Sequence, residues 1–136
     1  MTFFVLDSSA VLRYLDREAG FGRVREIFRV CASTTSVVLI SAIQWGEVAA
    51  VRRRQYGPLE QIRVLRDLAQ FDLQIVPADA ARAVEAAGIR VDYRMGSADS
   101  YAAELTLDSP DHVLITADYD FKAVEKLIRI EFLPAK

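Results

Sequence analysis

The sequence predicts an α/β fold in which a mostly parallel sheet is covered by helices on both faces. The main observation is that short apolar runs alternate with longer segments of helical spacing along the whole chain. This order favours parallel pairing of the strands, because each crossover has room for a helix. The length of 136 residues and the hydrophobic content of 52% are typical of one globular domain, which we expect to span residues 1–136.

The strands are predicted from apolar runs that are too short to be helices. Runs without polar alternation indicate strands that are buried on both faces, as in parallel sheets. We expect a sheet of about five strands. They are Thr2–Leu6, Val37–Ile40, Leu73–Val76, Val113–Thr116 and Ile128–Phe132.

The segments between these strands have the spacing and the end signals of helices. Ser41 and Gln44 are spaced as in a capping box, and Asp79 and Ser97 are suited to be N-caps. The predicted helices are Ser9–Arg17, Phe21–Cys31, Ala42–Gln55, Leu59–Phe71, Ala80–Val91, Ala98–Leu107 and Phe121–Leu127.

Composition excludes or disfavours several functional classes. His112 is the only histidine, which excludes a ribonuclease with two catalytic histidines and leaves a Ser–His hydrolase with little support. The six glycines are scattered, so there is no glycine-rich phosphate loop. The formal charge of −2 neither identifies nor excludes a nucleic-acid partner, because bound metal ions would neutralise part of the acidic side chains.

Other features of the sequence concern the cellular compartment. The single cysteine, Cys31, suits a reducing cytosol. The opening MTFFVLDSS has no basic segment of the kind that begins a signal peptide. No apolar run approaches the roughly 18 residues of a membrane-spanning helix. We therefore expect a cytoplasmic protein with no membrane association.

Acidic residues follow the predicted strands, at the edge where parallel sheets bind ligands. Asp7 directly follows the first strand, Glu47 lies in the second turn after the second strand, and Asp118 and Asp120 follow the fourth. Asp99 lies in the first turn of a later helix. Taken singly, each acid is also explained by helix capping, by the helix dipole or by a solvated surface. Glu47 fits this explanation least, because its neighbours are mostly apolar and a carboxylate there usually has a partner.

Taken together, the same acids are the donor set of a site for a hard cation. Three or four carboxylates without clustered cysteine or histidine suit Mg²⁺ or Mn²⁺ rather than zinc. Such ions can activate water and stabilise the attacking and leaving oxygens in phosphodiester hydrolysis. Capping and metal binding are alternatives for each residue, and for Asp118 the two roles are compatible.

Four segments of the chain carry a family resemblance. FFVLDSSAVLRYL, LISAIQWGEVAAV, MGSADSYAAEL and VLITADYDF together resemble the PIN domain, and in particular the short toxins of the VapC type. The resemblance covers essentially the whole chain. It implies a three-layer α/β/α fold and a metal-dependent endoribonuclease that is the toxin of a type II toxin–antitoxin system. It also implies Mg²⁺ or Mn²⁺ as cofactor, RNA as substrate, and a cognate antitoxin as partner, with the chain forming a homodimer or a toxin–antitoxin hetero-oligomer.

The resemblance assigns roles to individual residues. The positions that match the catalytic and metal-binding acids are Asp7, Glu47, Asp99 and Asp118. The positions expected to support them are Ser8, Thr116 and Asp120. Many relatives have Thr and Asn after the first acid, where this chain has Ser8 and Ser9, so the hydroxyl is kept at Ser8 and the amide is missing at Ser9.

Three basic side chains are candidates for contact with RNA, namely Arg13, Arg52 and Arg53. The alternative for Arg52 and Arg53 is a solvated helix end that suits the helix dipole.

Two other functional classes compete with the nuclease. A phospho-receiver signalling module also gathers acids at strand ends, but it needs paired acids after the first strand, where this chain has only Asp7. It also needs a lysine at the end of a ligand-bearing strand, whereas Lys122 falls in the following helix. A catalytically silent binding module would use the same acidic edge without cleaving RNA.

Overall fold

The computed structural model, which describes residues 1–136, contains a five-stranded sheet in which all neighbouring strands are parallel. The strand order is β3-β2-β1-β4-β5. The chain therefore builds outwards from β1 to β3 and then returns to the other side of β1 for β4 and β5. The strands are β1 (Phe3–Leu6), β2 (Val37–Ser41), β3 (Leu73–Val76), β4 (His112–Thr116) and β5 (Ile130–Phe132).

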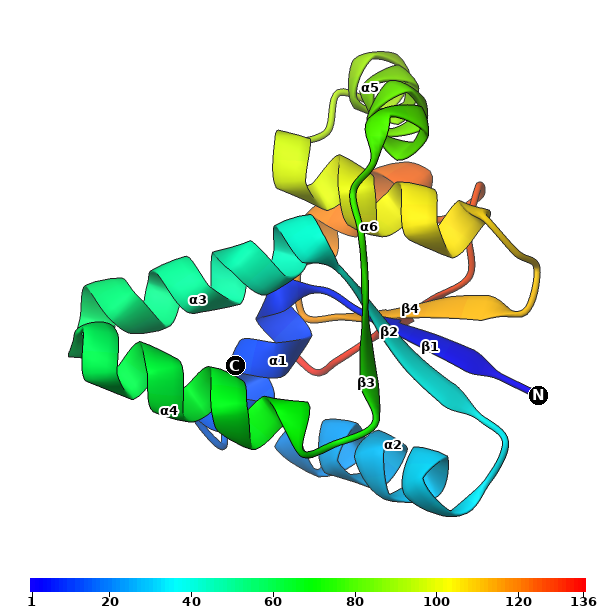
Figure 1. The fold of residues 1–136 in the computed structure, drawn as a ribbon. Coiled ribbons are helices and arrows are strands. Elements are labelled where there is room, and N and C mark those ends of the chain that lie inside the picture. The colour runs from blue at the N-terminus through cyan, green and yellow to red at the C-terminus, as the bar shows by residue number, and fades with distance from the viewer.

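Helices cover both faces of this sheet, as predicted (Figure 1). α1 and α2 pack on one face and α6 packs on the other, with α5 stacked on α6. α3 and α4 form a hairpin that projects beyond the carboxyl ends of the strands (Figure 1). The helices are α1 (Ser8–Leu15), α2 (Phe21–Ser33), α3 (Ala42–Tyr56), α4 (Pro58–Ala69), α5 (Ala80–Tyr93), α6 (Ser97–Leu107) and the 3₁₀ helix η1 (Tyr119–Val124).

Successive residues of the central strands point into opposite layers, because side chains alternate along a strand. Leu6 and Ile115 are buried in the layer that contains α1 and α2, whereas Val5 and Leu114 are buried in the layer that contains α6 and η1. Both layers are apolar, which explains why the central strands appear in the sequence as uninterrupted apolar runs.

The predicted helix starts are partly confirmed. Asp79 caps α5 and Ser41 caps α3, as expected. The prediction that Ser97 caps α6 is wrong, because the N-cap is Gly96 and it makes no side-chain capping bond. The capping box is wrong in its second half, because the Gln44 side chain bonds to two other elements and not to its own helix.

None of the helices is both long enough and apolar enough to cross a membrane.

Candidate functional site

Asp7 lies at the carboxyl end of β1, beside the position where the strand order reverses between β1 and β4. This switch point is where α/β sheets bind ligands. The Asp7 side chain is almost fully buried, at 1% exposure. Its Oδ1 accepts a hydrogen bond from the Ala10 N–H at 2.9 Å, and its Oδ2 accepts one from the Thr116 hydroxyl at 2.6 Å. The Ser9 hydroxyl lies 2.7 Å from Oδ1 and 2.9 Å from Oδ2, so hydrogen bonds hold both oxygens of this buried carboxylate.

The environment of Asp7 favours its protonated form. Burial raises the pKa of Asp7 to about 6, the hydrogen bonds from Thr116, Ala10 and Ser9 lower it, and the charge of Asp99 raises it further. The bond to Ala10 makes Asp7 the N-cap of α1, which confirms the capping role that the sequence allowed. A cation beside this carboxylate would favour the ionised form.

Asp99 lies in the first turn of α6 and is partly exposed. Burial is the largest cause that raises the pKa of Asp99 to about 6, and the charges of Asp118 and Asp120 raise it as well. A hydrogen bond from Gln44 lowers it, and the charge of Glu47 raises it. The acids identified from the sequence therefore act on one another electrostatically, which means that the fold gathers them at one edge of the sheet.

Thr116 and Asp118 connect the end of β4 to this group. The Asp118 carboxylate accepts a hydrogen bond from the Asp120 N–H at 2.9 Å and caps η1. The Asp118 N–H donates to the Thr116 hydroxyl at 2.9 Å, and that hydroxyl donates to Asp7. Thr116 thus links Asp7 and Asp118 directly through its hydroxyl, and its supporting role in a metal site stays a prediction.

Glu47 differs from the expectation that was based on its apolar neighbours. Its side chain is exposed on α3 and makes no hydrogen bond or ion pair, so no residue of this chain is the partner that was expected for it. The apolar neighbour Val48 is buried, because it faces a different direction around the helix from Glu47. Glu47 nevertheless lies close enough to Asp99 to raise its pKa, which keeps it at the acidic edge.

The donor chemistry of this edge fits Mg²⁺ or Mn²⁺, since every candidate ligand is a carboxylate oxygen. The side chains are not arranged as a ready-made cage, because no three Asp, Glu, His or Cys side chains converge closely enough to hold an ion. Three donors, from Ala10, Thr116 and Ser9, occupy three of the roughly four lone-pair positions of the Asp7 carboxylate, which leaves about one position for a cation. Metal binding by Asp7, Glu47, Asp99 and Asp118 therefore stays a prediction.

The serine that supports Asp7 is Ser9, and sequence reasoning expected Ser8. The Ser9 hydroxyl contacts Asp7 and also accepts a hydrogen bond from the Ala117 N–H at 2.9 Å. Ser8 contributes its backbone N–H, which donates to the Gln44 side chain. Two adjacent serines at a helix start differ only in the direction that each one faces, and the sequence contains no signal that distinguishes them.

Two of the three candidate RNA contacts have structural roles. Arg13 is buried and its Nη1 donates to the carbonyl oxygens of Ala19 and Pro134, at 2.7 and 2.8 Å. Arg52 has a side-chain exposure of 8% and pairs with Asp16 at 2.6 Å. The prediction that Arg13 and Arg52 contact RNA is therefore wrong for this structure, because both guanidinium groups are occupied by internal partners.

Arg53 remains as the exposed member of that set of arginines. Its Nη1 donates to Gln61 Oε1 at 3.2 Å on the surface of the α3–α4 hairpin.

Two surface cavities adjoin the acidic edge. One, of about 340 Å³, is lined by Asp99 and Asp120 together with Arg94. The other, of about 460 Å³, is lined by Asp118 and Ser9. The acids therefore face open space that can admit a ligand.

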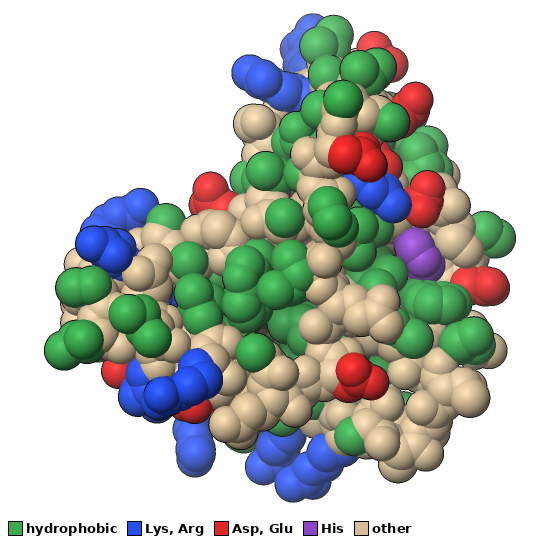
Figure 2. All heavy atoms as spheres, in the orientation of Figure 1, with side chains coloured by type: hydrophobic (Ala, Val, Ile, Leu, Met, Phe, Trp, Pro, Cys, Tyr) green, Lys and Arg blue, Asp and Glu red, His purple; other side chains and the backbone are tan.

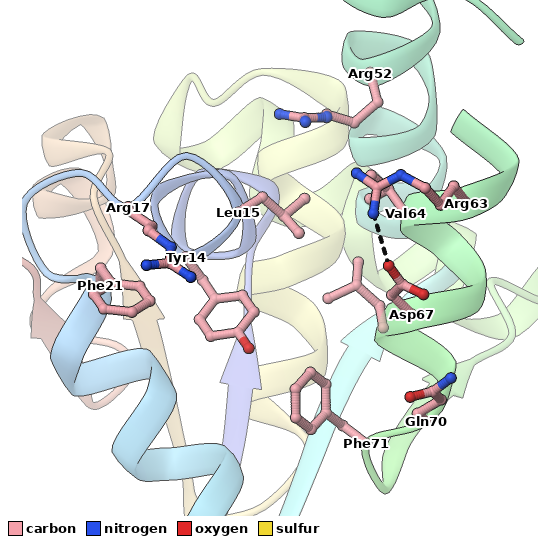
Figure 3. A pocket seen from close by; sticks show the side chains of 11 residues that line it. Tyr14, Leu15, Arg17, Phe21, Arg52, Arg63, Val64, Asp67, Gln70 and Phe71 are labelled. Atoms are coloured by element: carbon pink, nitrogen blue, oxygen red, sulfur yellow. Dashed lines mark hydrogen bonds and ion pairs between the residues drawn. The ribbon is translucent and has the colours of Figure 1, made fainter. Parts of the chain in front are cut away.

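A third cavity, of about 320 Å³, lies between α1, α2 and α4 and contains none of the candidate acids (Figure 3). The Tyr14, Phe21 and Phe71 rings line it, and Arg17 and Arg63 lie at its margin.

The chain belongs to the PIN domain family, whose model matches residues 4–127. No curated protein matches the chain by sequence.

Solved structures support the fold. VapBC2 from Rickettsia felis, bound to a DNA fragment from its promoter, aligns with a TM-score of 0.73 at 15% identity, over 98% of this chain and 100% of that chain. DNA-bound VapBC from Salmonella typhimurium aligns with a TM-score of 0.71 at 21% identity, over 97% and 98% of the two chains. VapC20 from Mycobacterium tuberculosis, a toxin that cleaves the sarcin–ricin loop, aligns with a TM-score of 0.69 at 18% identity, over 89% and 94%.

The strand order also bears on the phospho-receiver alternative. Receiver domains have the order 2-1-3-4-5, whereas this sheet has the order 3-2-1-4-5. The structure therefore does not support a receiver fold.

Proposed function

We propose that this protein is a VapC-type toxin, an endoribonuclease that hydrolyses RNA phosphodiester bonds with divalent metal ions. The observation that carries the proposal is the meeting of Asp7 and Asp118 beside the switch point between β1 and β4, where one Thr116 hydroxyl donates to the Asp7 carboxylate and accepts from the Asp118 N–H. Membership of the PIN family and the likeness to a toxin that cleaves the sarcin–ricin loop support the same activity.

Asp7, Asp99 and Asp118 would hold Mg²⁺ or Mn²⁺, with Glu47 approaching from α3. The ion would supply Lewis-acid activation of a water molecule and stabilise the charge that develops on the phosphate. Within the chain, the Thr116 hydroxyl orients the Asp7 carboxylate through the 2.6 Å hydrogen bond. Attack by water in this site would leave 5′-phosphate and 3′-hydroxyl ends.

The RNA backbone needs a basic surface beside the acids. On the face in Figure 2, basic side chains gather over the outer part of the α3–α4 hairpin and along α2. Arg53 and Arg54 are exposed at the end of α3, the helix that also carries Glu47. These two arginines are the residues that we assign to RNA backbone contact.

The partner in this proposal is a cognate antitoxin that covers the acidic edge. An antitoxin arginine would pair bidentately with the carboxylates and occupy the place of the metal ion. A further part of the antitoxin would insert an apolar side chain into the aromatic cavity between α1, α2 and α4 (Figure 3). Arg17 at the margin of that cavity favours an acidic residue beside the apolar one, whereas Arg63 is already paired with Asp67.

The test is a cleavage assay on purified protein with a structured RNA, in Mn²⁺, in Mg²⁺ and in chelator. We expect cleavage in either metal and none in chelator, with 5′-phosphate ends on the products. RNA binding without cleavage in every metal would replace this proposal with the silent binding module. Cleavage that persists in chelator would exclude the metal mechanism.

A further inference from the structure

The side chain of Gln44 is a buried amide whose oxygen and nitrogen both form hydrogen bonds. It lies in the first turn of α3 with 1% exposure. Its Oε1 accepts a hydrogen bond from the Ser8 N–H at 2.7 Å, and its Nε2 donates to the Ala98 carbonyl at 2.7 Å. Because one partner is only a donor and the other only an acceptor, the orientation of the amide is fixed.

The partners of Gln44 are the immediate neighbours of two candidate metal ligands. Ser8 follows Asp7, and Ala98 precedes Asp99. The two bonds therefore join the start of α1 to the start of α6 through one side chain of α3. Glu47 lies one turn further along the same helix. The Gln44 side chain therefore connects α1, α3 and α6, the three helices that carry or follow these acids.

The connection through Gln44 opposes an electrostatic repulsion between the acids on either side of it. The charges of Asp7 and Asp99 repel each other, and Asp99 also faces Asp118 and Asp120. This repulsion acts to separate the helix starts when no cation lies between them. A buried amide that loses either partner is left unsatisfied, so the Gln44 bridge resists the separation.

We propose that Gln44 is a positioning residue that sets the separation of Asp7 and Asp99 for metal binding. The inference rests on the proposed metal-dependent function, and it assigns the role to a residue outside the acidic set. Gln44 does not itself touch the metal or the RNA. It acts through the backbone beside the two acids, at Ser8 and Ala98, and its amide also lowers the pKa of Asp99.

The first variant is Gln44→Met, which keeps the length of the side chain and removes both hydrogen bonds. We expect Mn²⁺ affinity to fall about 10–100-fold, the range seen when residues that orient metal ligands are replaced. The turnover number should fall with it, while the KM for RNA changes less than about threefold. Direct Mn²⁺ titration by calorimetry measures the affinity without reference to activity.

The second variant is Ser8→Pro, which cuts one end of the bridge and is expected to fold. Ser8 is the first residue of α1, where proline is well tolerated, and the backbone of Asp7 before it is extended, at φ −93° and ψ 175°. Proline removes the N–H that binds Gln44, whereas Ser8→Ala keeps it. We expect Ser8→Pro to weaken Mn²⁺ binding at least fivefold more than Ser8→Ala does.

Two controls separate positioning from general loss of stability. Val48→Ala removes buried apolar volume from the same helix, and Gln61→Met removes a glutamine bond to the Ala49 carbonyl, 3.2 Å long, on the α3–α4 hairpin. Both should keep wild-type Mn²⁺ affinity. The positioning role is overturned if Gln44→Met and Ser8→Pro bind Mn²⁺ as wild type does, or if Val48→Ala loses as much affinity. A wild-type protein that binds no Mn²⁺ would overturn the proposed function and this inference with it.

Discussion

Asp99 is the residue at which capping and metal binding predict opposite changes in stability. Because its folded pKa of about 6 is raised above the ordinary value of 3.8, its protonated form stabilises the fold below about pH 4, and that contribution is lost as the pH rises through 6. In chelator, Asp99→Asn should therefore melt at the same temperature as wild type near pH 4 and a few degrees higher at pH 7. A capping role predicts a lower melting temperature at pH 7, since the start of α6 would lose a favourable charge.

The same variant should respond weakly to metal. Wild type in Mn²⁺ at about a hundred times the dissociation constant should gain about 2.7 kcal/mol of stability, and Asp99→Asn much less. RNA cleavage should fall by at least about 100-fold. Asp92→Asn, an exposed acid on α5, is the matched control and should behave as wild type. An equal metal-induced shift in Asp99→Asn and wild type would show that Asp99 is not a ligand.

Thr116→Val removes a hydroxyl that donates to one side-chain oxygen and accepts from one backbone N–H. The Asp7 carboxylate and the Asp118 N–H each lose a hydrogen-bond partner in a buried or partly buried place. We therefore expect a loss of about 1–3 kcal/mol in the free energy of unfolding at pH 7. The Asp7 pKa should rise further, because the bond from Thr116 lowers it. Urea unfolding and carboxyl NMR titration measure the two effects. Thr116→Ser keeps the hydroxyl, and an equal loss in that variant would show that the methyl group is what matters.

At the residue scale, the positions of the acids could be predicted from the sequence, but the side chains that orient them could not. Asp7 and Asp118 stand at strand ends, a position visible in the apolar pattern. The roles of Ser9 and Gln44 depend on the direction that each side chain faces, because each forms a hydrogen bond to an element far away in the sequence. The apolar neighbours of Glu47 were a poor guide to its surroundings, since Glu47 is exposed and Val48 is the only apolar residue of α3 that is buried.

At the element scale, the arginine-rich end of α3 divides into one structural residue and two surface residues. Arg52→Met should cost about 1 kcal/mol in urea unfolding, because it removes the 2.6 Å ion pair with Asp16, whose partly exposed carboxylate can be solvated by water. Arg53→Met should change stability by less than about 0.5 kcal/mol and raise the KM for RNA. The assignment of Arg52 to the fold is contradicted if its replacement leaves stability unchanged and weakens RNA binding.

Element types were predictable from apolar periodicity, and element ends were not. The helix predicted over Phe121–Leu127 is the 3₁₀ helix η1, which begins earlier because Asp118 caps it. The strand predicted over Ile128–Phe132 begins at Ile130, and Ile128 is buried against the layer of α6 instead. In both cases tertiary packing and a side-chain cap decide the boundary, and neither is visible in a short window of sequence.

At the scale of the whole molecule, the neighbouring gene product offers the most direct test of the toxin proposal. Co-expression should give a complex that survives purification, with RNA cleavage lost while the complex is intact. Phe71→Ala in the aromatic cavity should weaken the complex, and an antitoxin whose arginines are replaced should bind without inhibiting. Absence of both co-purification and inhibition would contradict the toxin assignment. The control is the free chain, measured in parallel. If it cleaves RNA, the loss of cleavage in the complex is caused by the partner.

The class of the sheet followed from the alternation of strands and helices, but the order of its strands did not. Nothing in a single sequence states that β4 pairs with β1 and not with β3. That pairing creates the switch point and brings Thr116 to Asp7. The sequence therefore predicted that the acids would lie at the carboxyl ends of the strands, as ligand-binding residues do in parallel sheets. Their location between β1 and β4 could be learned only from the three-dimensional structure.

The hydrogen bond between Asp7 and Thr116 spans 109 positions of the chain, and this has a consequence for biosynthesis. A ribosome that adds about 5–20 residues per second needs roughly 5–20 s to reach Thr116 after it has made Asp7. During that interval the central strand has no β4 neighbour, and its carboxylate has no threonine to hold it. An unfinished chain therefore cannot assemble the proposed nuclease site, so the ribosome that makes the chain is not exposed to that site until translation is nearly complete.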